Sequence, residues 1–294
     1  NEVEKASWSF IVWESRLPQA ITALLCGMAL AASGLMLQTT FNNPLADPSI
    51  LGISSGASLG VALVMLAGAG TITAGVFTLS GFLSVIIGAF IGSMLVMGII
   101  LFFSTLIKNS IMLLIIGIMI GYITSSAISL LNFFSTAEGV HSYMIWGMGN
   151  FGGVSLQQLP FFSLVTAAGL LITILLIKPL NALLLGTRYA ENLGINIRRT
   201  RNLLLVATGL LTATTTAFCG PIGFIGLAVP HVARILFADA DHRILVPASI
   251  LTGIVVMLLC DVLAKLLTFP INTITALLGI PIVIWVVIRN KSIV

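Results

Sequence analysis

The chain has 294 residues, of which 58% are hydrophobic and only 7% are charged, and its mean hydropathy is +1.16. Because soluble domains are about one-quarter charged, this composition excludes a soluble globular domain, a disordered chain and a secreted disulfide scaffold, and it indicates a membrane protein. The net charge of +4 is spread thinly. It marks cytoplasmic loops rather than a nucleic-acid-binding surface.

The N-terminal stretch 1–16 is amphipathic, with Trp8, Phe10 and Trp13, and we expect it to lie at the membrane interface. After it come apolar segments, and a helix that crosses the membrane needs about 20 such residues. The chain predicts an all-α, polytopic membrane helical bundle that forms a single transmembrane domain over residues 1–294. Its nine predicted spans are 17–41, 51–69, 76–106, 111–134, 158–178, 202–219, 222–238, 244–268 and 274–289.

Glycines recur at four-residue spacing within three of these spans. Such spacing lets two helix backbones approach closely, which is how helices pack in a membrane. We therefore expect close helix pairs at Gly52, Gly56 and Gly60, at Gly88 and Gly92, and at Gly117 and Gly121.

The basic residues predict the orientation of the bundle, because Lys and Arg concentrate in cytoplasmic loops. If the loop 179–201 is cytoplasmic, ten of the 13 basic residues fall on that side. Residue 1 is then outside and the C-terminus inside, so we expect one further helix upstream and ten in the complete protein. The ten are Lys108, Lys178, Arg188, Arg198, Arg199, Arg201, Arg234, Arg243, Arg289 and Lys291; Lys5, Arg16 and Lys265 remain for the outer side.

The sequence offers no enzymatic site. No glycine-rich phosphate loop ending in Gly-Lys occurs, and His141, His231 and His242 are far apart, so we expect no catalytic residue, metal site or cofactor in this chain. Asp261 lies well inside a span, with Lys265 four residues later. Either the two neutralise each other locally, or Asp261 is the coupling group of a proton- or sodium-driven secondary transporter.

The longest polar stretch of the predicted cytoplasmic side is GTRYAENLGINIRRTR at 186–201. Ala190 to Leu193 predict a short helix that Gly194 ends as a C-cap. The stretch is either a solvated, positively charged loop or a docking helix for a cytosolic partner.

Three motifs resemble signatures of the FecCD/BtuC-type permease family, the membrane subunits of ABC importers for iron–siderophore complexes, haem and vitamin B12. They are RLPQAITALLCGMALAASGLMLQTTFNNPLADPSILGISSGAS, then GPIGFIGLAVPHVARIL with DHRILVPAS, and TALLGIPIVIWVV. The resemblance runs from about Arg16 to Arg289. It implies a ten-helix fold whose first helix precedes this sequence, in agreement with the charge pattern.

The resemblance also implies roles for individual residues. Those that couple to an ATPase subunit are Gly186, Arg188, Ala190, Glu191, Leu193 and Gly194; those of a cytoplasmic gate are Asn43, Leu45, Asn109 and Ser110. Arg16 and Lys265 match positions that dock a periplasmic binding protein, and the alternative for them is an interfacial anchor. Gln19 departs from the family, and the loop 268–273 is short. His231 and Arg234, after the helix-breaking Pro230, are interpreted as a structural hinge and anchor.

The sequence therefore predicts the permease of an ATP-driven importer in the bacterial inner membrane. It is expected to form a homodimer with two ATPase subunits, which hold ATP and Mg²⁺, and to receive cargo from a periplasmic binding protein. The pathway would follow the two-fold axis, lined by 111–134 with help from 51–69 and the last span. The sequence does not choose between siderophore, haem and cobalamin, although the breadth of the family favours an iron complex. An intramembrane enzyme is a third class of function, but this sequence shows no nucleophile–base or metal-ligand pair within a helix to support it.

Overall fold

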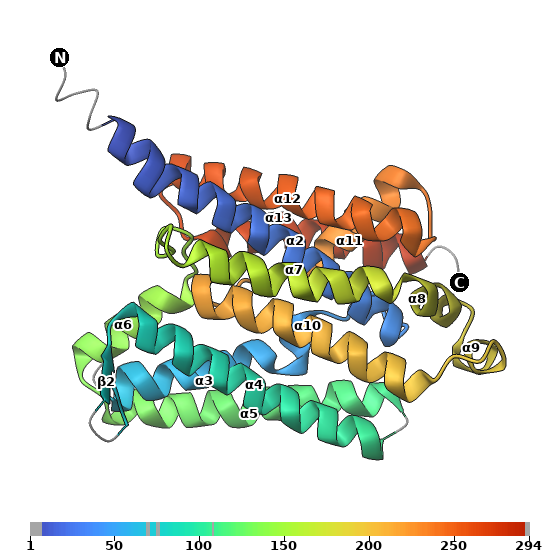
Figure 1. The fold of residues 1–294 in the computed structure, drawn as a ribbon, viewed down its shortest axis with the longest axis horizontal. Coiled ribbons are helices and arrows are strands. Elements are labelled where there is room, and N and C mark those ends of the chain that lie inside the picture. Colours follow the sequence, from blue (N-terminus) through green and yellow to red (C-terminus); the bar gives the residue numbers. More distant parts are fainter. Residues whose placement is uncertain (1–7, 69–70, 75–76, 108, 292–294) are drawn as a thin grey trace.

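The computed structural model describes residues 8–68, 71–74, 77–107 and 109–291, so Lys5 and Lys108 lie outside the described part. The long helices run side by side along the longest axis, with β2 and α6 at one end and α9 at the other (Figure 1). The helices are α2 (Leu17–Thr40), α3 (Ile53–Ala62), α4 (Phe82–Leu106), α5 (Ser110–Phe134), α6 (Ala137–Gly147), α7 (Leu159–Leu175), α8 (Ile177–Leu184), α9 (Thr187–Asn192), α10 (Ile197–Cys219), α11 (Ile225–Phe237), α12 (His242–Leu267) and α13 (Ile271–Lys291). Two short π-helical segments, η1 (Ile11–Arg16) and η3 (Leu63–Ala67), one 3₁₀ helix, η2 (Pro48–Leu51), and two strands, β1 (Thr71–Ala74) and β2 (Phe77–Ser80), complete the described elements.

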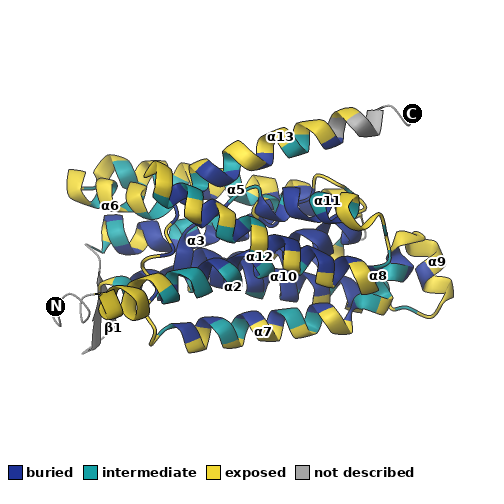
Figure 2. Cartoon of the chain, turned by 90° about the horizontal axis from the view of Figure 1, so that it is seen from above, coloured by how far each residue is buried: buried dark blue, intermediate teal, exposed yellow. Residues whose placement is uncertain are grey.

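Helix α2 lies at the centre of the bundle. It packs against α7, α10, α11 and α12, and 78% of its most apolar stretch is buried, compared with 22% of that of α5. Figure 2 shows the buried residues gathered around α2, α10 and α12, whereas α7 and α13 carry many exposed ones. A helix that is apolar on every face belongs in such a core. Helix α2 therefore fixes the position of the turn that follows it.

The glycine spacing predicted close helix pairs, and the α3–α4 contact confirms one of them. A Cβ atom added at Gly60 would lie 2.0 Å from the backbone oxygen of Gly88, and one at Gly92 would lie 2.1 Å from that of Gly56. No carbon fits at such distances, so the two backbones touch where only glycine allows it.

Replacing Gly92 by alanine should therefore destabilise the protein by about 2 kcal/mol, because the backbone of α3 must move to make room. Gly98, on the same helix, has open space around it, so Gly98→Ala should be neutral or stabilising by up to about 1 kcal/mol. Thermal unfolding in detergent, followed by circular dichroism, measures both variants. Equal unfolding midpoints for the two would contradict this packing argument.

Each of the nine predicted spans contains an apolar helix of the described chain. Within the described residues, five helices are long and apolar enough to cross a membrane, and α7 with α8 would be a sixth although they meet at a bend of 51°. The remaining three, Ile53–Ala67, Ile225–Phe237 and Ile271–Val286, are shorter. The all-α membrane bundle is thus confirmed, whereas the number of crossings stays a prediction.

The predicted span 76–106 was wrong at its beginning. Strands β1 and β2 form a small antiparallel hairpin in which Thr71 pairs with Ser80 and Ala74 with Phe77. Helix α4 starts only at Phe82, after Gly81 at φ +73°. An apolar stretch rich in β-branched and aromatic residues suits a strand as well as a helix, so hydropathy could not separate them.

Candidate functional site

The predicted coupling residues form a short helix that projects from one end of the bundle. We define the coupling segment as residues 186–196. Helix α9 lies between Gly186 at φ +99° and Gly194 at φ +81°, conformations that favour glycine. The predicted helix end at Gly194 is confirmed, but the helix begins at Thr187 rather than Ala190. The early start adds nearly one turn to the exposed surface.

Ala190 anchors this helix and the other predicted coupling residues face outward. Ala190 is fully buried in a cluster with Leu180 and Leu204, so α9 is held against α8 and α10. The side chains of Arg188, Glu191 and Leu193 are exposed, Leu193 by 59%. An anchored helix with an exposed outer face can transmit the movement of a partner as a rigid body.

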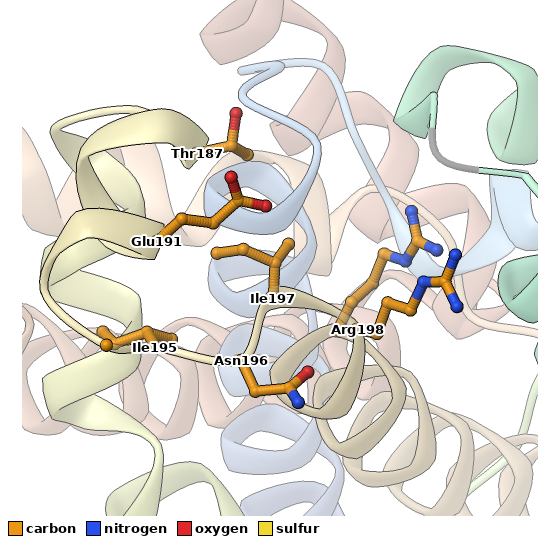
Figure 3. A pocket seen from close by; sticks show the side chains of 8 residues that line it. Thr187, Glu191, Ile195, Asn196, Ile197 and Arg198 are labelled. Atoms are coloured by element: carbon orange, nitrogen blue, oxygen red, sulfur yellow. The ribbon is translucent and has the colours of Figure 1, made fainter.

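A cleft of about 600 Å³ separates α9 from the start of α10. Figure 3 shows the carboxylate of Glu191 beside Thr187 on one side and Arg198 on the other. Asn196 begins α10 by accepting the backbone N–H of Arg199 at 3.0 Å. The cleft thus offers both signs of charge to a partner. Its lining residues are Thr187, Glu191, Gly194, Ile195, Asn196, Ile197, Arg198 and Arg201.

The first predicted gate position is a tight turn after α2, and we call residues 41–45 the first gate segment. The Oδ1 atom of Asn43 accepts the backbone N–H of Leu45 at 2.9 Å, which closes an Asx turn. Asn42 has a φ of +44°. Leu45 is 40% exposed and can meet another molecule, whereas the amide oxygen of Asn43 is already used to shape the turn.

Helix α11 holds this turn in place. His231 donates from Nε2 to the backbone oxygen of Pro44 at 2.7 Å, because a carbonyl can only accept. Arg234 donates to Oε1 of Gln38 at 2.7 Å, and Gln38 donates to the backbone oxygen of Leu227 at 3.1 Å. The predicted anchor at His231 and Arg234 is therefore confirmed.

Asp47 joins the same two elements. Its buried carboxylate accepts the backbone N–H of Ser49 at 2.9 Å and also that of Leu227. Burial raises the pKa of Asp47, although these hydrogen bonds oppose the rise. The residues after the first gate segment are thus fastened to the first turn of α11.

The second predicted gate position begins α5, and we call the described residues 107 and 109–111 the second gate segment. Asn109 is the N-cap of this helix and accepts the backbone N–H of Ile111 at 2.9 Å. The side chain of Ser110 lies outside the described part. As with Asn43, the amide oxygen of Asn109 holds the local backbone conformation through this hydrogen bond. Its contribution to a gate is therefore to fix the shape of the segment.

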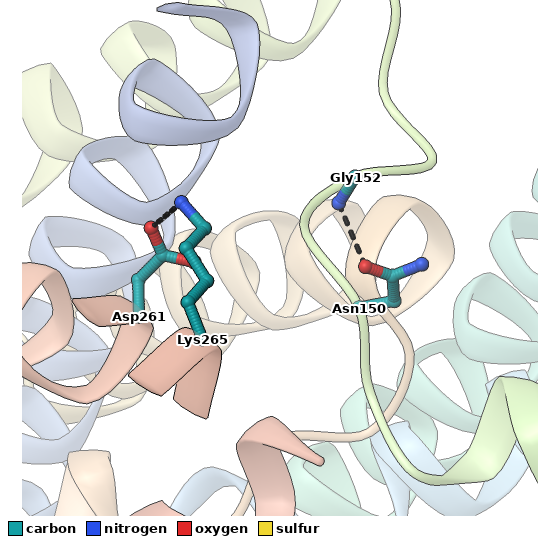
Figure 4. Close-up of polar contacts among 4 residues, drawn as sticks. All are labelled: Asn150, Gly152, Asp261 and Lys265. Carbon is teal, nitrogen blue, oxygen red and sulfur yellow. Dashed lines mark hydrogen bonds and ion pairs between the residues drawn. The ribbon is translucent and has the colours of Figure 1, made fainter. Parts of the chain in front are cut away.

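The residues predicted to dock a binding protein lie toward the opposite end of the bundle, where α2 begins and α12 ends. Arg16 is exposed. Lys265 is 30% exposed and forms an ion pair with the buried Asp261 at 2.5 Å (Figure 4). The local pairing of Asp261 with Lys265 is confirmed. In the same view, Asn150 accepts the backbone N–H of Gly152 at 2.8 Å.

Removing the lysine of this pair should destabilise the protein. Lys265→Met leaves Asp261 buried without its counter-ion and should cost about 3 kcal/mol, the lower end for a broken buried pair because Lys265 is partly exposed. The double variant Asp261→Asn/Lys265→Met removes both charges and should recover most of that loss. Thermal unfolding in detergent measures both, and a double variant as unstable as the single one would contradict the pairing argument.

Sequence reasoning missed three residues near the coupling segment, namely Thr39, Asn181 and Arg201. Arg201 had been counted as a loop cation, but it is buried within α10. These residues act through contacts between distant parts of the chain, for which one sequence carries no signal. Among the described residues, no three His, Cys, Asp or Glu side chains are placed to hold a metal ion.

Comparison with known proteins gives a consistent result. The model of the FecCD transport family matches residues 2–289. The vitamin B12 import system permease protein BtuC of Klebsiella pneumoniae is 37% identical over 98% of this chain and 85% of its own length. That of Salmonella typhimurium is 38% identical over 97% and 86%.

Two solved structures share the fold. One, described as a metal-chelate type ABC transporter in an inward-facing conformation, matches with a TM-score of 0.86 and 32% identity over 96% of this chain and 88% of its own. PsaBC from Streptococcus pneumoniae, solved with a Fab, matches with a TM-score of 0.57 and 18% identity over 91% and 89%, which is a likeness of fold alone.

Proposed function

The chain belongs to the FecCD transport family, and we propose that it is the permease subunit of an ATP-driven importer that brings a metal chelate across the bacterial inner membrane. The observation that carries this proposal is α9. It is a short, buried-anchor helix with an exposed face and a charged cleft, at one end of a bundle otherwise made of apolar helices. An anchored helix with an exposed, charged face suits the docking of a partner protein that moves it.

That partner is a cytosolic ATPase subunit. The sequence has no Gly-Lys phosphate loop, so ATP and Mg²⁺ are bound by the partner and this chain performs no covalent chemistry. Each copy of the permease receives one ATPase subunit, and ATP shifts the population between its conformations.

Two copies of the chain form the pathway. Ile115, Met119 and Ile123 form an exposed apolar stripe on α5, 49%, 49% and 70% exposed, at the i, i+4, i+8 spacing of one helix face. Such a stripe suits a pathway or a subunit contact on a two-fold axis. The binding protein delivers cargo at the opposite end, where Arg16 is exposed.

The cargo is a metal chelate, either a cobalamin, a haem or a ferric siderophore. Cobalamin is the first candidate, because the similar BtuC proteins are named for vitamin B12 import. This replaces the preference for an iron complex, which rested on the breadth of the family alone.

Reconstitution tests the proposal. Liposomes that contain the permease, its ATPase subunit and its binding protein are supplied separately with cyanocobalamin, a ferric hydroxamate siderophore and haemin. We expect ATP-dependent uptake of one of the three. Uptake by the permease alone, independent of ATP and abolished by Asp261→Asn, would instead establish a secondary transporter.

A further inference from the structure

Both ends of the coupling segment are connected to a gate segment by polar side chains that are half-buried or buried. Helix α8 precedes the coupling segment and carries Asn181, and α10 follows it and carries Arg201. Each of these side chains leaves its own helix to bind the end of another one. The two connections lead to different gate segments.

The first connection runs from Asn181 through His242 to Thr39. The Oδ1 atom of Asn181 accepts both the backbone N–H and the Nδ1–H of His242, each at 2.8 Å. Its Nδ2 donates to Asp241 at 2.6 Å, which fixes the orientation of the amide.

The other ring nitrogen of His242 contacts Thr39. Nε2 of His242 forms a hydrogen bond of 2.8 Å with the hydroxyl of Thr39, and this hydroxyl also contacts the backbone oxygen of Leu35 at 3.1 Å. The ring of His242 is fully buried. Thr39 lies on the last turn of α2, directly before the first gate segment.

The second connection runs from Arg201 to the end of α4. Its guanidinium, on a side chain only 5% exposed, donates to the backbone oxygens of Ser104 and Ile107, the latter at 2.9 Å. The hydroxyl of Ser104 also donates to Asn202 at 2.8 Å. The last carbonyls of a helix lack partners within it and favour a cation. Ile107 is the first residue of the second gate segment.

Buried polar connections resist separation. A buried donor or acceptor that loses its partner pays its full desolvation cost, so the joined helix ends move together rather than apart. We propose that the Asn181–His242–Thr39 and Arg201–Ile107 bridges carry displacement of the coupling segment separately to the first and second gate segments. Arg201, His242 and Thr39 are positioning residues in this scheme, which rests on the proposed function.

Pulsed electron–electron double resonance, which measures distances between spin labels, tests the two bridges in the complex with the ATPase subunit. The native cysteines Cys26, Cys219 and Cys260 are buried, so spin labels attach selectively to cysteines introduced at exposed positions. A label at Arg188 reports the coupling segment, one at Leu45 the first gate segment and one at Ile111 the second. Distances between the two copies are measured with and without ATP and vanadate.

Each variant should abolish the ATP-dependent distance change at only one gate segment. Thr39→Val removes the hydroxyl at nearly constant shape and should abolish the ATP-dependent shift at residue 45 while those at 188 and 111 persist. Arg201→Met should abolish the shift at 111 while those at 188 and 45 persist. Thr39→Ser keeps the hydroxyl and Arg199→Met changes an exposed arginine of the same helix, so both controls should behave as the native complex.

The outcomes separate the bridges from the proposed function. No shift at residue 188 in the native complex would count against an ATP-driven permease. A native response at 188 with unchanged gate shifts in both variants, or with both gates lost in each, would overturn the two-bridge proposal. If Arg201→Met does not assemble, Arg201→Lys takes its place, because it keeps the charge but loses the planar fork and should reduce the shift at 111 alone.

Discussion

Reversing the charge of Glu191 by Glu191→Lys should lower ATP-driven uptake by about 100-fold while leaving the permease folded. The carboxylate lies on the exposed face of α9, beside a cleft whose other side carries Arg198. Losing a desolvated charge contact costs roughly 2–5 kcal/mol, and each 1.4 kcal/mol is about tenfold in an equilibrium. The ATPase subunit should therefore fail to bind, which co-purification and the ATP hydrolysis rate of the reconstituted complex measure.

Glu138→Lys is the matched control for this experiment. Glu138 is also exposed but lies on α6, at the other end of the bundle, so its reversal should leave the binding of the ATPase subunit unchanged. If Glu191→Lys still bound the ATPase subunit and supported full uptake, α9 would not be the docking helix. If both variants failed equally, the cause would be a general loss of assembly.

Replacing Gly34 by leucine should prevent the chain from reaching its folded state. A Cβ atom at this position would lie 1.8 Å from the backbone oxygen of Gly226, so α2 and α11 touch through their backbones. A shift of α2 would also disturb its packing against α7, α10 and α12. We expect a loss of at least about 4 kcal/mol, as for the most disruptive single substitutions. The yield of monodisperse protein after detergent extraction measures this loss.

The expected loss also has a structural reason beyond the clash. If α11 moved away from α2, the hydrogen bonds from His231 to Pro44 and from Gln38 to Leu227 would break together. Gly98→Leu places the same side chain in open space on the outer face of α4 and should be extracted in normal yield. Equal yields of the two variants would show that the α2–α11 contact can adapt.

Several parts of the fold and of the candidate site could be predicted because they depend on local composition. The apolar helices follow from segments of about 20 hydrophobic residues. The close α3–α4 contact follows from the glycine spacing at Gly56, Gly60, Gly88 and Gly92. The end of α9 follows from Gly194, whose positive φ favours glycine. The pairing of Asp261 with Lys265 follows from their i, i+4 spacing.

Other features were predicted wrongly or not predicted, because the local sequence does not specify them. The predicted span 76–106 included strand β2, because a short apolar run fits strand and helix alike. The helix α6, which starts at the N-cap Thr136, and the bend between α7 and α8 were not predicted. Arg201 looked like a loop cation because its acceptors lie more than 90 residues earlier in the chain.

The sequence by itself determined that this chain is a membrane protein, in which parts of the chain its apolar helices lie, and which family it resembles. These properties depend on side chains near one another in the chain, since hydropathy and helix capping act over one or a few turns. Only the tertiary structure decided which buried polar groups meet, as in the contacts of Asn181 with His242, His242 with Thr39, and Arg201 with Ile107. Burial makes such partners necessary, but it is the packing of distant helices that selects them.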